Sequence, residues 1–385
     1  MSPVDYLDPT DALPKIGGVG KDASTLLNTT FFKHGKSFPS IIDGEIVIVG
    51  FPESRNSSNK GASKSPDLIR EFFYSLSSFP IKTKIIDAGN LKPTKTTKDS
   101  YSAIKDLADY FLSKGATLVV LGGTQELSYP IYQAIKLHRK SITASFIDSR
   151  IDMDDNNGEF CSTGYIKHFL DEPIENLFNI SIVGYQGYLC DPNSIEMLNK
   201  MNHEIFRLGF VRGNYREIEP TFRDSDLVSF DLGAIRNSDC QGNIFPSPNG
   251  LYAEEACQLS RYAGLSDKTC CFGVFELNAE NYPQSSHLSA QLMWHFIEAY
   301  SQRKLERPNS NGDFKKFIVE SSTPEIEMVF YKSLSSDNWW MEIPTSLKDQ
   351  FSNKSIIIAC SYADYVAASK HEIPERWLRV YNKVV

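Results

Sequence analysis

The chain has 385 residues, which is enough for one large domain with an added elaboration. Its hydrophobic fraction of 41% and charged fraction of 23% are those of an ordinary globular protein. The formal net charge is −8 and basic residues are scattered, which argues against a nucleic-acid or anionic-membrane partner.

The sequence predicts a cytoplasmic protein without a membrane span. No run of about 18 apolar residues occurs, and the first residues lack the basic and apolar regions of a signal peptide. The seven cysteines have no C-x-x-C spacing, so we expect reduced thiols.

Apolar runs and helical patterns alternate along most of the chain. Residues 1–40 indicate an irregular arm, and residues 51–64 a long polar loop. Strands are predicted over residues 45–50, 84–87, 116–122, 142–147, 179–183, 204–208, 227–230 and 271–277. Helices are predicted over residues 66–76, 101–113, 127–137, 253–263 and 288–302. This alternation predicts βαβ crossovers, a mainly parallel sheet and helices on both of its faces.

Residues 303–315 form a polar break, and a C-terminal extension follows over residues 306–385. Strand-like pieces recur there at residues 317–320, 327–331, 339–341 and 355–359. Trp339, Trp340 and Trp377 lie near arginines, a composition typical of protein interfaces. We therefore expect this extension to bind a protein partner; packing of the tail on the main domain is the alternative.

Four short stretches follow or end strand-like runs: residues 121–126, 146–152, 229–233 and 275–278. Such strand ends are where α/β sheets bind ligands. Together these stretches resemble the metal-binding and substrate-contacting signatures of the arginase (ureohydrolase) family, and are most similar to its formimidoylglutamase branch. The resemblance covers about residues 41–305 and implies a three-layer α/β/α sandwich that binds two manganese ions. By analogy it also implies an oligomer.

Several metal-binding positions depart from the family pattern. The family's Gly-Gly-Asp-His-Ser is matched by Gly-Gly-Thr-Gln-Glu, so Gln125 replaces a ligand histidine. The family's Asp-Ala-His-x-Asp is matched by Asp148-Ser-Arg-Ile-Asp152, so Arg150 replaces another. In Ser-x-Asp-x-Asp, the first aspartate is Asp231 and the second has become a glycine, Gly233.

The resemblance then implies a degenerate site with four residual oxygen ligands: Gln125, Asp148, Asp152 and Asp231. Arginine stays protonated and cannot bind a metal. We therefore predict that the Arg150 guanidinium pairs with Asp148 and Asp231 and substitutes for the second ion. Without that ion the shared metal-bound water that supplies hydroxide is lost.

Our leading hypothesis is a catalytically inactive, binding or scaffolding protein with no catalytic residues and no cofactor. The alternative is a hydrolase of linear amidine C–N bonds that uses one Mn²⁺. In that case Asp148 and Asp231 hold the ion, and Glu276 resembles the substrate-contacting glutamate of the family's Glu-x-Asn motif. His168 is a candidate acid or base there, or a helix-surface histidine.

Overall fold

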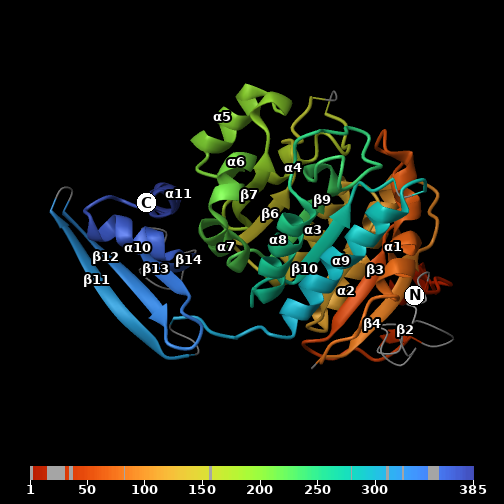
Figure 1. Ribbon diagram of the computed structural model, residues 1–385, viewed down its shortest axis with the longest axis horizontal. Helices are drawn as coiled ribbons and strands as arrows, with labels where there is room; N and C mark the ends of the chain where they lie inside the picture. The colour runs from red at the N-terminus through yellow and green to blue at the C-terminus, as the bar shows by residue number, and fades with distance from the viewer. Residues whose placement is uncertain are drawn as a thin grey trace.

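The computed structural model describes residues 3–14, 31–33, 38–81, 83–155, 158–278, 280–308, 312–322, 325–345 and 355–385. Most of them build a large sheet covered by helices on both faces, with a smaller sheet set to one side (Figure 1). No helix in these ranges is long and apolar enough to cross a bilayer.

The main sheet has ten strands in the order β1-β4-β3-β5-β10-β9-β6-β7-β8, with β2 also paired to β4. Its strands are β1 (Leu7–Asp8), β2 (Phe31–Lys33), β3 (Ile46–Gly50), β4 (Ile85–Leu91), β5 (Thr117–Leu121), β6 (Ile142–Ile147), β7 (Leu177–Tyr185), β8 (Glu204–Arg207), β9 (Leu227–Asp231) and β10 (Cys271–Phe275). All pairings are parallel except that of β1 with β4. The predicted mainly parallel α/β/α sandwich is confirmed.

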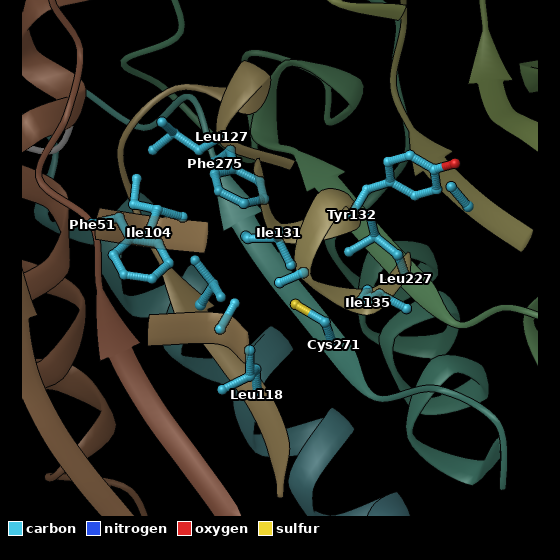
Figure 2. Packing of buried hydrophobic residues seen from close by; sticks show 14 of the residues in the cluster. Phe51, Ile104, Leu118, Leu127, Ile131, Tyr132, Ile135, Leu227, Cys271 and Phe275 are labelled. Carbon is cyan, nitrogen blue, oxygen red and sulfur yellow. The ribbon is translucent and has the colours of Figure 1, made fainter. Parts of the chain in front are cut away.

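The helices are α1 (Ser65–Phe73), α2 (Thr97–Ser113), α3 (Ser128–His138), α4 (Ile166–Leu170), α5 (Pro192–Lys200), α6 (Leu208–Gly213), α7 (Tyr215–Arg223), α8 (Ala253–Leu265) and α9 (Pro283–Tyr300). Alternate residues of each central strand enter opposite cores. Val119 packs with α1, α7, α8 and α9 on one face, whereas Leu118 packs with α2, α3 and α4 on the other. Figure 2 shows part of the second core, where Ile104 of α2 and Ile131 of α3 approach Leu118. Burial on both faces explains the continuous apolar runs in the sequence.

The structure differs from the sequence-based prediction in three places. The N-terminal arm contributes β1 and β2 to the sheet, so it is not wholly irregular. The predicted strand at residues 204–208 ends at Arg207, because α6 begins at Leu208. The helices α4 to α7 were not predicted, since their apolar residues are few and widely spaced.

The C-terminal residues form a second unit with a hydrophobic core of its own. It contains β11 (Phe314–Ser322), β12 (Glu325–Ser333), β13 (Trp339–Pro344) and β14 (Ser355–Cys360) in one antiparallel sheet, followed by α10 (Tyr362–Ser369) and α11 (Glu375–Val384). The aromatic tail that the sequence showed at residues 377–381 is therefore helical.

This unit docks on the main domain at the amino ends of the strands. Arg223, at the end of α7, donates to the backbone oxygens of Trp339 at 2.8 Å and Cys360 at 3.1 Å. Arg376 of α11 forms a largely buried ion pair of 2.7 Å with Glu204, the first residue of β8. Ligand sites of α/β sheets lie at the opposite, carboxyl ends, so the C-terminal unit does not cover that edge.

Candidate metal centre

Four adjacent strands bring the predicted site residues together. In the sheet β5 pairs with β10, β10 with β9, and β9 with β6. Asp148 follows β6, Asp231 ends β9, and Glu276 follows β10. Beyond β5, Gly122 and Gly123 have φ values of +69° and +73°, a conformation that lets the chain turn sharply before Gln125. All four loops therefore meet at one edge of the sheet.

Asp148, Asp152 and Asp231 form a compact carboxylate cluster. One oxygen from each lies within 4.8 Å of the other two. Burial raises the pKa of Asp148 well above its usual range, and the charge of Asp152 raises it further. Burial and the charge of Asp231 do the same for Asp152. Within the described ranges, no Lys, Arg or His side chain lies within 4.0 Å of these carboxylates as an ion-pair partner.

Gln125 adds a neutral oxygen at the neighbouring strand end. Its Nε2 donates to Ser229 Oγ at 3.1 Å, which fixes the orientation of the amide. Its Oε1 is buried and has no hydrogen-bond partner. Carboxylate and amide oxygens are the ligands of hard cations such as Mg²⁺, Ca²⁺ and Mn²⁺. The residues therefore fit one divalent cation held by the three aspartates and Gln125.

The position of a second cation is not supported by the residues present. Gly233 offers no side chain, and its backbone N–H donates to Asp231 Oδ1 at 2.5 Å. A Cβ built at Gly233 would lie 2.6 Å from Asn243 Nδ2, and that amide approaches Asp231 Oδ1 at 3.4 Å. Protein atoms therefore fill the space next to Asp231 where the family pattern has a second aspartate.

Arg150 does not form the contact ion pair that we predicted. Its backbone N–H donates to Asp148 Oδ1 at 2.9 Å, but its guanidinium carbon lies 4.6 Å from the centre of the Phe245 ring. Its Nη1 donates to the backbone oxygen of Leu189 at 3.4 Å. The positive charge still acts across the site, because it counters the rise that burial causes in the pKa of Asp231.

Glu276 is held in a strained conformation beside the cluster. Its φ is +64°, which a residue with a Cβ adopts only when its surroundings enforce it. Oε1 accepts from the backbone N–H of Gln125 at 3.0 Å, and Oε2 accepts from Asn59 Nδ2 at 2.9 Å. Burial, Asp231 and Glu126 raise the pKa of Glu276 well above its usual range. Sequence reasoning missed the role of Asn59, because one asparagine in a polar loop carries no signal.

His168 lies on α4 among aromatic rings, 5.0 Å from the ring of Phe160 and 5.7 Å from that of Tyr129. It makes no printed polar contact with the carboxylate cluster, so its proposed acid or base role stays a prediction. All seven cysteines are free thiols, consistent with the reduced state expected from the sequence.

Residues 44–298 match the family model described as the arginase family. The chain belongs to the arginase family. The match ends before the C-terminal unit, which makes that unit an addition to the arginase-family core.

Individual members of the arginase family are distant from this chain. It is 23% identical to formimidoylglutamase of Staphylococcus haemolyticus over 260 residues, 63% of this chain and 81% of the relative. A structure of Trypanosoma cruzi formiminoglutamase with Mn²⁺ superposes with a TM-score of 0.62 at 23% identity, covering 68% of this chain and 94% of that one. Formimidoylglutamase of Bacillus subtilis gives a TM-score of 0.66 at 18% identity, covering 76% and 97%. These similarities confirm the arginase-like fold.

Proposed function

We propose that this arginase-family protein holds one divalent cation, does not carry out two-metal hydrolysis, and acts as a binding protein. The observation that carries the proposal is the cluster of Asp148, Asp152 and Asp231, which is buried without a cationic side chain in contact among the described residues. Buried carboxylates at such distances require a proton or a cation. The earlier expectation of a cofactor-free cluster finds no support.

Manganese is the cation that best agrees with the comparisons, since a similar structure contains it. A bound divalent cation would supply Lewis acidity and would acidify a coordinated water. The residues of this chain supply four oxygens for one ion, and Gly233 and Asn243 leave no ligand set for a second. The hydroxide that depends on two ions is therefore not expected to form.

The alternative is a C–N hydrolase that acts on a linear amidine with one ion. One observation favours it: the strained, doubly hydrogen-bonded carboxylate of Glu276. Backbone strain of this kind is frequent at functional sites. Formimidoylglutamases among the similar proteins make a formimidoyl compound the first substrate to assay.

A combined metal and activity measurement separates the two proposals. The protein is purified with Mn²⁺, its metal content is determined by elemental analysis, and release of formamide, urea or ammonia from amidine substrates is assayed. One manganese per chain without turnover supports the binding protein. Turnover that disappears in Asp231→Ala overturns it in favour of the hydrolase. Absence of bound metal overturns both.

We also propose that the C-terminal unit provides a protein-binding surface. Ile318 on the edge strand β11 is 53% exposed, and Tyr362 at the start of α10 is 60% exposed. Deleting the unit would also expose the buried surface under Arg223, so point changes are the better test. Partner capture that is reduced in both Ile318→Glu and Tyr362→Glu, with unchanged melting temperature, supports the proposal. Unchanged capture contradicts it.

A further inference from the structure

The guanidinium of Arg150 leaves most of its hydrogen-bonding capacity unused. Arginine carries five N–H donors. Within the described chain, Nη1 makes one long bond of 3.4 Å to the Leu189 oxygen, and Nε is buried without any partner. A buried donor without an acceptor is unfavourable. The arginine is nevertheless held in place, because its guanidinium stacks on the Phe245 ring.

A short turn fixes this guanidinium at the rim of the carboxylate cluster. Asn243 Nδ2 approaches Asp231 Oδ1 at 3.4 Å, and Asn243 Oδ1 accepts from the backbone N–H of Phe245 at 2.8 Å. Phe245 in turn supports Arg150 with its ring. The guanidinium is thus near enough to act electrostatically on Asp231, yet it forms no ion pair with that residue. Space for another group remains between the cluster and the unsatisfied N–H donors.

We propose that Arg150 and the cation site together bind the carboxylate group of a small-molecule ligand. This inference rests on the single-cation proposal above. A carboxylate accepts two parallel hydrogen bonds from the planar edge of a guanidinium, the geometry that the unpartnered Nε offers.

Charge selects the same class of ligand. The three aspartates carry a formal charge of −3, which a divalent cation and Arg150 together neutralise. The nearby Glu276 carboxylate already accepts hydrogen bonds at both oxygens. An amidinium group placed against Arg150 would meet a like charge, whereas a carboxylate would meet an opposite one. Arg150 therefore changes the preferred ligand from a cation to an anion.

Acetate and acetamidinium test this directly, because they have nearly the same shape and opposite charge. Mn²⁺ binding to the full chain is first measured by calorimetry, in the wild type and in Arg150→Gln. Each small ion is then titrated into the Mn²⁺-loaded proteins. We expect acetate to bind the wild type more tightly than acetamidinium, and Arg150→Gln to weaken acetate binding roughly 10-fold or more.

Two further variants control for folding and for net charge. Arg150→Lys keeps the charge but loses the planar donor edge, so it should bind acetate with intermediate affinity. Arg207→Gln removes the same charge from a solvent-exposed arginine that donates to Tyr185, and should leave acetate binding unchanged. The melting temperature of each variant without ligand reports whether it is folded.

The possible failures are distinguishable. Equal acetate binding by the wild type and Arg150→Gln overturns the carboxylate subsite, as does tighter binding of acetamidinium than of acetate by the wild type. Failure of the wild type to bind Mn²⁺ instead overturns the single-cation proposal. Titration of acetate into the metal-free proteins then decides the role of Arg150 by the same comparison, and absence of an Arg150-dependent difference there overturns it.

Discussion

Replacing Asp231 by asparagine should change protein stability in opposite directions without and with a divalent cation. The substitution keeps the shape of the side chain and an oxygen that can accept from the backbone N–H of Gly233. It removes one of three charges whose oxygens lie within 4.8 Å of one another. In the metal-free protein the loss of that charge relieves repulsion, whereas in the metal-bound protein it removes a charged ligand.

The geometry sets the magnitude. Two full charges separated by 4.8 Å repel by about 3 kcal/mol at an effective dielectric constant of about 20. Partial protonation of the cluster reduces that repulsion. We therefore expect Asp231→Asn to raise the free energy of unfolding of the metal-free protein by about 1–3 kcal/mol at pH 8. With Mn²⁺ at about 100 times its Kd, the wild type gains about 2.7 kcal/mol and the variant gains less.

The pH dependence follows from the raised pKa values. Burial and like charges raise the pKa values of Asp148, Asp152 and Asp231 in the folded state. The folded protein then binds more protons than the unfolded chain between the ordinary carboxyl pKa and the raised one. The stability of the metal-free protein is therefore fully present below about pH 4 and is lost as the pH rises through the raised values. The advantage of Asp231→Asn should shrink as the pH is lowered toward 5.

Urea denaturation at pH 5 and pH 8, with chelator or with Mn²⁺, measures these differences. Asp106→Asn is the matched control, because Asp106 is exposed on α2 and its replacement should change stability by less than about 0.5 kcal/mol. If Asp231→Asn destabilises the protein equally in all four conditions, the cluster carries no excess negative charge and the reasoning is wrong.

Three further substitutions test separate parts of the structure. Asn59→Ala removes two hydrogen bonds to Glu276 and should lower the free energy of unfolding by about 1–3 kcal/mol in urea titrations; an unchanged midpoint would contradict the clamp described above. Gln125→His should bind Mn²⁺ more tightly than the wild type, by roughly 10-fold in calorimetry, if residue 125 contacts the ion; equal affinity would exclude that contact. Arg376→Gln breaks the ion pair with Glu204 and should destabilise the docked C-terminal unit by about 3 kcal/mol, seen as earlier exposure of tryptophan in denaturant; coincident unfolding curves for variant and wild type would argue against this contribution.

The sequence alone determined the main domain and much of its site. Strands buried on both faces, such as β3 and β5, read as unbroken apolar runs, and these runs alternate with helical patterns. The strand-end positions of Asp148, Asp231 and Glu276 followed from the same alternation. Local periodicity carries this information because it reflects burial of each element by itself.

Only the tertiary structure decided what the substituted residues do. Arg150 was expected to reach the carboxylates, but Phe245, almost a hundred residues away along the chain, holds its guanidinium instead. Asn243 fills the space beside Gly233, and Asn59 clamps Glu276 from a distant loop. Each of these contacts joins residues far apart in sequence. A side chain's direction depends on which groups surround it in space, and no local pattern encodes those groups.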